Sequence, residues 1–255
     1  MKTWIAFLKK ECLDLWRTGK LLILGALFCL FGIMNPAVAK LTPLLMDLFA
    51  ESLADSGMVI TEVSVDATTS WVQFFKNIPM TLIAFVFVFS NSFTKEYETG
   101  TLVLVLSKGV PRYKVYISKA VVQILTFTIG YWISFGITYG YNAYYWDNSV
   151  AIGLLPTVIS FWVFDLWTIS LMCFLSVISK SQMEVLLGTG TLVLICYILS
   201  LIPIIAPYLP IALLDSSKMM QSFDDTEYFK TYISTAVMSL GLLICGVPIL
   251  NKKQL

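Results

Sequence analysis

The chain has 255 residues, of which 58% are hydrophobic and only 13% charged, with a formal net charge of +1. This is more apolar and about half as charged as a typical soluble domain, and the apolar residues form long blocks, which excludes a soluble globular protein. There is no histidine, the commonest general base and metal ligand, and no G-x-x-x-x-G-K-[ST] phosphate-binding loop. We therefore expect a polytopic membrane protein that is not an enzyme and holds no metal or cofactor of its own.

The first twenty residues are predicted to form an amphipathic helix at the membrane interface. Their basic residues include Lys9 and Lys10, and Trp16 would lie at the level of the lipid head groups. A simple membrane anchor is the other interpretation of the same pattern. The apolar side is made of residues at helical spacing: Trp4, Leu8, Cys12 and Trp16.

Six later segments are apolar and long enough to cross a hydrocarbon core of about 30 Å. The predicted fold is therefore an all-α bundle of six transmembrane helices in a single domain, residues 1–255. Within the third span, Gly136 and Gly140 form a G-x-x-x-G pattern that favours close helix contact. The spans are Leu21–Ala39, Trp71–Phe93, Ala120–Tyr141, Leu154–Ile178, Val185–Ile205 and Tyr232–Leu250.

The distribution of lysine and arginine predicts how the bundle is oriented. With six spans, both termini lie on one side, and 13 of the 17 Lys and Arg residues fall on that side. Because basic residues accumulate in short cytoplasmic segments, we expect a multi-pass protein of the cell membrane with both termini in the cytoplasm.

The connection between the second and third spans, residues 94–119, is unusually patterned. A solvated cytoplasmic loop would explain its basic residues, but it would not explain the apolar run Leu102–Leu106 between acidic and basic residues. The pattern favours a short helix with Thr99 or Thr101 as the N-cap and Gly109–Pro111 as the stop. The apolar face of such a helix must pack against a partner or the membrane edge.

Asp165 is the only carboxylate deep within a predicted span. An intramembrane charge is costly, so this side chain should face protein or water. It could line a transport pathway, form a structural hydrogen bond with a neighbouring helix, or stay protonated.

Three prolines interrupt the segment that follows the fifth span: Pro203, Pro207 and Pro210. Proline breaks helical hydrogen bonding, so the chain is predicted to turn back near the outer leaflet within residues 203–230. A plain helix end is the alternative.

The stretch "KEYETGTLVLVLSKGVPRYKVYISK" resembles the cytoplasmic connection of type-two ABC exporter permeases. The family pattern has an acidic residue, Gly-Thr-Leu, a leucine-rich stretch, a turn with an arginine, and a later lysine, here Lys119. The resemblance implies a coupling helix that docks on a separate nucleotide-binding subunit, which would carry the ATP and Mg²⁺. The residues that take these coupling roles are Glu96, Glu98, Gly100, Thr101, Leu102, Leu104, Ser107 and Arg112.

The resemblance further implies a permease subunit of an ATP-driven exporter that moves an amphipathic or hydrophobic cargo, such as a peptide, an antimicrobial compound or a lipid-like molecule. Two ATPase subunits and a second permease copy are implied, as a homodimer or a heterodimer, with no nucleic-acid partner. The N-terminal helix would then be the elbow helix, and Asp165 and the three prolines would line or gate the pathway. The alternative function is an ion- or proton-coupled secondary transporter that works without an ATPase.

Overall fold

The computed structural model of the protein describes residues 2–54, 65–107, 109–215 and 225–253. Within these ranges the chain forms helices and no strand, and six of the helices are long and apolar enough to cross a membrane. The predicted all-α, six-span fold is therefore confirmed. The elements are α1 (Lys2–Arg17), α2 (Lys20–Ala54), α3 (Ala67–Phe89), α4 (Thr94–Glu98), α5 (Thr101–Ser107), α6 (Arg112–Tyr145), η1 (Asn148–Val150), α7 (Leu154–Ile178), α8 (Gln182–Leu199), η2 (Ala206–Tyr208), η3 (Pro210–Leu214) and α10 (Asp225–Lys252).

The helix ends differ from the predicted spans for identifiable reasons. Helix α7 matches its predicted span residue for residue, whereas α2 continues well past the predicted end at Ala39. Helix α6 starts eight residues before the predicted Ala120, because Pro111 is in an extended conformation and a helix can start directly after it. Helix α8 stops at Leu199, since the chain turns before it reaches Pro203.

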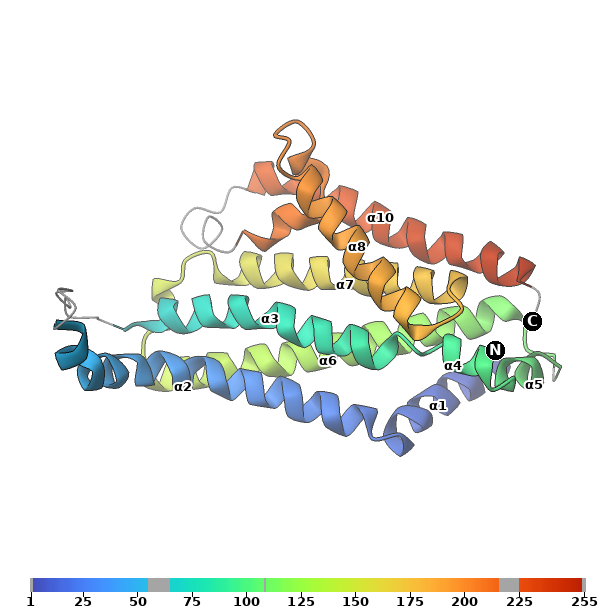
Figure 1. Ribbon diagram of the computed structural model, residues 1–255, viewed down its shortest axis with the longest axis horizontal. Helices are drawn as coiled ribbons and strands as arrows, with labels where there is room; N and C mark the ends of the chain where they lie inside the picture. The colour runs from blue at the N-terminus through green and yellow to red at the C-terminus, as the bar shows by residue number, and fades with distance from the viewer. Residues whose placement is uncertain (1, 55–64, 108, 216–224, 254–255) are drawn as a thin grey trace.

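The spans form one elongated bundle (Figure 1). Helices α2, α3, α6, α7 and α10 run along its length, and α8 crosses it obliquely. Helix α7 is the most deeply buried span and packs against α10, α8 and η3, whereas α8 is the least buried. The bundle is thus built around α7 and α6, with α8 on its periphery.

The two ends of the bundle carry different elements. Helices α1, α4 and α5 lie at one end together with the C-terminal end of α10 (Figure 1); we call this the basic end, because most of the Lys and Arg residues fall there. At the opposite end, Trp71 Nε1 of α3 donates to Asn148 Oδ1 over 3.1 Å, and the Asn148 amide donates to the carbonyl of Tyr139 over 3.2 Å. The end opposite the basic end is therefore fixed by polar contacts between α3, η1 and α6.

Aromatic side chains fill the space between α2, α3 and α6. The Phe28 and Phe127 rings meet edge to face, with centroids 5.5 Å apart, and Phe85 meets Phe127 in the same manner at 5.1 Å. Phe28 lies directly over Gly130, where a Cβ atom would be 2.3 Å from the ring. The glycine is required for this close packing of α2 on α6.

Candidate functional site

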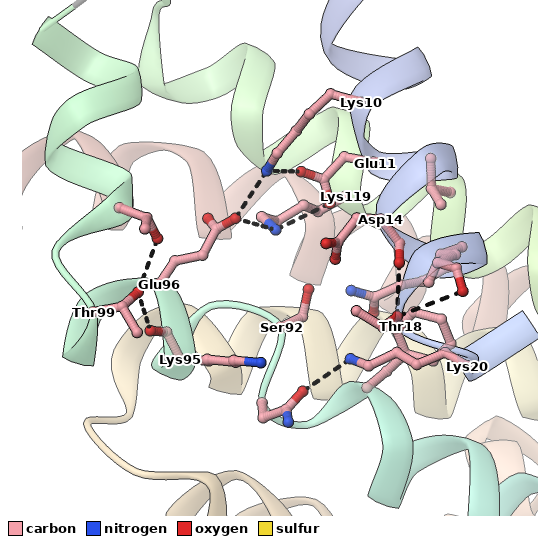
Figure 2. A pocket seen from close by; sticks show the side chains of 16 residues that line it. Lys10, Glu11, Asp14, Thr18, Lys20, Ser92, Lys95, Glu96, Thr99 and Lys119 are labelled. Atoms are coloured by element: carbon pink, nitrogen blue, oxygen red, sulfur yellow. Dashed lines mark hydrogen bonds and ion pairs between the residues drawn. The ribbon is translucent and has the colours of Figure 1, made fainter.

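Four charged side chains from three helices meet at the basic end in one ion network (Figure 2). Lys119 Nζ of α6 lies 3.1 Å from Glu11 Oε2 of α1 and 3.0 Å from Glu96 Oε1 of α4. Lys10 Nζ of α1 contacts the same two carboxylates, at 2.8 Å from Glu11 Oε1 and 3.1 Å from Glu96 Oε1. The two ammonium and two carboxylate groups form a closed ring with no net charge, which we call the ion ring.

The ion ring is mostly removed from solvent. The exposed fraction of the side chain is 4% for Lys119, 9% for Glu11 and 16% for Glu96, and only Lys10 is half exposed. Removing one partner from a buried ion pair leaves an uncompensated charge, which typically destabilises a protein by about 3–5 kcal/mol. The ion ring therefore fixes α1 and α4 firmly on α6.

The ionised state of the ring is maintained by its own contacts. Burial opposes ionisation of Glu11, but the charge of Lys119 and the hydrogen bond and charge of Lys10 outweigh it, so the pKa of Glu11 lies below its ordinary 4.5. Burial also opposes ionisation of Lys10, but its bonds with Glu11 and the charges of Glu11 and Glu96 keep the pKa of Lys10 above its ordinary 10.5. Both groups are therefore charged across the whole range around neutral pH.

One face of α1 places Glu11 in this ring. Phe7, Glu11 and Leu15 follow one another at intervals of four residues, which puts them on the same side of a helix, and all three are buried. The two apolar residues pack into the core above and below the carboxylate. A charged residue thus enters the protein interior through an otherwise apolar helix face.

The other face of α1 contains the residues that the sequence assigned to the membrane interface. Trp4, Cys12 and Trp16 are exposed, Trp16 to 74%, and Leu8 is half-buried. Lys9 is exposed as well. Helix α1 therefore has an apolar face turned away from the bundle, as an interfacial helix requires; its role as an elbow helix stays a prediction.

The chain between α3 and α6 forms two short helices, α4 and α5, separated by Gly100. Gly100 has a φ of +66°, a left-handed conformation that favours glycine. Because α5 begins at Thr101, Gly100 occupies the position before the helix, and neither Thr99 nor Thr101 is its N-cap. Thr99 instead ends α4, and its hydroxyl lies 2.9 Å from that of Thr101.

The predicted coupling residues on α4 and α5 point in different directions. Glu98, Thr101 and Ser107 are exposed, whereas Leu102 is 1% exposed and belongs to the protein's own core. Val103, which was not singled out, is 48% exposed. The side chain of Leu104 lies outside the described residues. The apolar run therefore packs partly on its own chain and presents a narrower face to the outside than the sequence suggested.

Arg112 joins α6 to the last helix. Its guanidinium group satisfies carbonyl oxygens that the C-terminal turn of α10 leaves without intrahelical partners, and its charge complements the helix dipole. Arg112 is thus a helix cap in this structure. Its Nη1 donates to the backbone oxygens of Leu250 at 2.9 Å, Asn251 at 3.2 Å and Lys253 at 2.5 Å.

Lys253 caps the C-terminal end of α7 in the same way. Its Nζ donates to the carbonyl oxygens of Val177 at 2.6 Å and Ser179 at 3.2 Å, where α7 ends. The same ammonium lies 4.0 Å from the centroid of the Tyr97 ring, a favourable cation–π distance. Burial lowers the pKa of Lys253 below its usual value. The ends of α7 and α10 are therefore tied to the region around α4 and α6.

Asp165 lies inside the bundle and not on its surface. Its side chain is 1% exposed in the middle of α7, and its Oδ2 has no hydrogen-bond partner among the described residues. One of the three roles considered for Asp165 was a structural hydrogen bond, and the described residues supply none to this oxygen. An unpartnered carboxyl in the interior is costly, and its role in a transport pathway stays a prediction.

The proline-rich segment after α8 folds back on the bundle. Pro203 is exposed, Pro207 is half-buried and Pro210 is buried, in a stretch of turns and two 3₁₀ helices. The Thr231 hydroxyl of α10 donates to the carbonyl of Pro207 over 2.6 Å, and η3 packs on α7 and α10. Residues 216–224 of the predicted re-entrant segment lie outside the described residues, and a gating role for the prolines stays a prediction.

The sequence reasoning missed Glu11 and Lys253 and gave Lys119 no role beyond its place in a motif. Glu11 could have been found from the spacing of Phe7, Glu11 and Leu15, which places a carboxylate between two apolar residues on one helix face. Lys119 is a cation next to the start of a span, where an acidic partner is expected. The pairing between α1 and α4 leaves no local sequence signal, because its members are far apart in the chain.

Together these features define a helical, multi-pass membrane protein in which α1 and α4, at one end, are joined to the span α6 by buried charges. Across the part of the chain that the structure describes, no group of three His, Cys, Asp or Glu side chains could hold a metal ion. Residues 5–244 match the family described as ABC-2 family transporter protein. The chain belongs to this family of ABC transporter permeases, which confirms the resemblance seen in the sequence. No curated protein matches the chain.

Membership of the family has direct consequences. The chain is a membrane-spanning transport subunit and not itself the catalytic one, and the family implies association with an ABC ATPase subunit. The family thus favours a permease of an ABC transporter over the alternative of a secondary transporter without an ATPase.

Proposed function

We propose that the chain is the permease subunit of an ATP-driven exporter and that α4 and α5 dock on its ATPase. The observation that carries this proposal is the ion ring, which joins α4 directly to the interfacial helix α1 and to the long helix α6 through Lys119. A rigid, buried connection of this kind transmits a displacement of α4 to two membrane helices. A solvated loop could not do so.

The position of the docking segment fits the expected orientation. The basic end carries α1, α4, α5 and the C-terminal end of α10 (Figure 1), and the excess of Lys and Arg there favours the cytoplasmic side. An ATPase that uses cytoplasmic ATP and Mg²⁺ would meet α4 and α5 on that side of the cell membrane.

The complete exporter would contain two permease chains and two ATPase subunits. ABC ATPases close as a pair around ATP, and each chain supplies one docking segment, so two chains are needed; we favour a homodimer, with a related second permease as the alternative. The periphery of the bundle offers a surface for the second copy, since α8 is the least buried span and exposes apolar residues such as Leu187 and Tyr197.

The cargo is expected to be amphipathic or hydrophobic. An apolar hollow of about 380 Å³ lies between α7, α8 and α10, and its walls include Trp167, Leu192 and Met238. Such a surface suits an apolar peptide, an antimicrobial compound or a lipid-like molecule better than a charged solute.

The docking proposal can be tested on Val103, which is exposed on α5. Val103→Asp adds a charge to the outer face of α5 without touching the core, so it should abolish co-purification with the co-expressed ATPase while the variant still inserts and folds. Val150→Asp is the matched control, because Val150 is 54% exposed at the opposite end of the bundle. If Val103→Asp and Val150→Asp both retain the ATPase and support equal transport, α5 is not the docking element.

A further inference from the structure

A polar cavity lies beside the ion ring. Its volume is about 350 Å³, and its walls come from α1, the beginning of α2, the end of α3 and the connection to α4, from α4 and the start of α5, and from α6. Lys20, Ser92 and Lys95 reach it from different segments (Figure 2). We call it the basic pocket.

The basic pocket has an unbalanced positive charge. Within the ion ring, Lys10 and Lys119 neutralise Glu11 and Glu96, which leaves Lys20, Lys95 and Asp14 as the other charged groups of the pocket wall. Two cations face one carboxylate, so the wall has an excess of one positive charge. A ligand with a single negative charge would make the pocket neutral.

The cations are also available for a ligand. Among the described residues, Lys20 Nζ donates only to the neutral Asn91 Oδ1, over 3.1 Å. Lys95 is exposed, and its ammonium has no hydrogen bond or ion pair in the part of the chain that the structure describes. An ammonium group that is directed into a cavity without a carboxylate partner is a donor for an anion.

Neutral donors complete the wall. The Ser92 hydroxyl lines the pocket and makes no side-chain hydrogen bond among the residues drawn in Figure 2. Gln123 is 2% exposed and its Oε1 accepts from Cys173 Sγ over 3.2 Å, which directs its amide NH₂ group away from that contact. Two ammonium groups, a hydroxyl and an amide suit the several acceptor oxygens of a phosphate group.

The level of the pocket relative to the membrane indicates which kind of molecule would supply the phosphate group. Lys20 is the first residue of a membrane-spanning helix, and the next turn exposes Leu22 to 76% and Ile23 to 56%. Trp16, just before it, is 74% exposed. Apolar side chains that face lipid therefore begin at the level of the pocket, which is the level of phospholipid head groups.

We propose that the basic pocket binds the phosphodiester group of a singly anionic membrane phospholipid, with Lys20 and Lys95 as the charged contacts. The bound lipid would lie between α1 and the α3–α4 connection, next to the ion ring. The proposal is independent of the ATPase and of the transported cargo. It assigns a specific lipid site to a place where the sequence indicated only an interfacial helix and a coupling segment.

The test is native mass spectrometry of the purified full-length chain titrated with phosphatidylglycerol in detergent. Each lysine near an anionic lipid contributes a factor of about five, so Lys95→Gln should weaken binding about fivefold and the double variant Lys20→Gln/Lys95→Gln about twenty-five-fold. Lys114→Gln is the matched control: it removes a lysine at the same end that does not line the pocket, and it should bind like the wild type.

Two further arms identify the source of the phosphate. Phosphatidylcholine, whose choline cancels the phosphate charge, should bind much more weakly, and soluble glycerol phosphate should not displace phosphatidylglycerol at equal concentration. Equal binding of the two lipids, or an equal loss of phosphatidylglycerol binding in Lys95→Gln and Lys114→Gln, would overturn the proposal. Displacement of phosphatidylglycerol by glycerol phosphate would show that a membrane lipid is not the source of the bound phosphate. Lys95 is exposed and unpaired, so Lys95→Gln should fold normally, and a thermal melt checks this.

Discussion

Replacing Lys119 by methionine removes the central cation of the ion ring while keeping the length of the side chain. The ammonium of Lys119 lies about 3 Å from both carboxylates and is 4% exposed. Without it, Glu11 and Glu96 must share Lys10, and Glu96 Oε2 already lacks a hydrogen-bond partner within the described part of the chain. Loss of one member of a buried ion pair predicts a decrease in the free energy of unfolding of about 3–5 kcal/mol.

A double-mutant cycle distinguishes this mechanism from a simple packing defect. Lys119→Met/Glu11→Gln again leaves one positive and one negative charge in the ring, so it should be more stable than the sum of the two single variants predicts by about 1–3 kcal/mol. The free energies can be measured by titrating sodium dodecyl sulfate into the protein in dodecyl maltoside and following tryptophan fluorescence. If the two substitutions are additive, the charges do not act as a unit and the reasoning is wrong.

Three other predictions concern the pH dependence and two packing contacts. Folding lowers the pKa of Glu11, so the contribution of its carboxylate to stability is complete above the ordinary pKa of 4.5 and is lost as the pH falls through the lowered pKa. The difference in melting temperature between the wild type and Glu11→Gln should therefore be constant near neutral pH and shrink only in acid. Arg112→Ala leaves three carbonyl oxygens of the α10 end without their donor, so it should reduce the free energy of unfolding by about 1–3 kcal/mol in the same titration, and an unchanged value would show that water replaces the cap. Gly130→Ala should reduce the free energy of unfolding by about 1–3 kcal/mol, because the new Cβ would meet the Phe28 ring. Gly136→Ala is the control and should leave the stability unchanged, because a Cβ there would meet nothing within 4 Å. Equal effects of the two substitutions would exclude the steric explanation.

Most of the fold could be predicted from the sequence because the membrane permits few solutions. Every buried backbone group in lipid must be paired internally, so a long apolar block specifies a helix almost by itself. The predicted fourth span agrees with α7 at both ends. The predicted helix ends are wrong where the helices extend beyond the hydrocarbon core. Helix α6 begins before the apolar block, at Arg112, and α2 continues to Ala54. At these ends, local turn geometry and contacts outside the membrane determine where the helix stops.

The candidate site was less predictable because it depends on contacts between distant segments. Glu96 could be singled out from its motif, but its partners Lys10 and Lys119 lie on other helices. Arg112 was assigned to the ATPase interface from its place in the motif; in the structure it caps α10, a contact that the sequence did not indicate, and its role at the interface stays a prediction. The close helix contact that the G-x-x-x-G pattern favours is not found at Gly136 within the described residues, where an added Cβ would meet nothing within 4 Å, whereas a close approach does occur at Gly130.

Helix α6 has a mechanical consequence that follows from its length. Its 34 residues extend about 51 Å, longer than the hydrocarbon core by about 20 Å. An α-helix resists compression along its axis, so it behaves as a lever whose two arms each measure about 25 Å. A tilt of about 5° around the midpoint moves each tip by about 2 Å, and in opposite directions. Lys119 and Tyr139 lie on opposite sides of the midpoint of α6, so a movement of Lys119 into the bundle would move Tyr139 and its contact with Asn148 in the opposite direction.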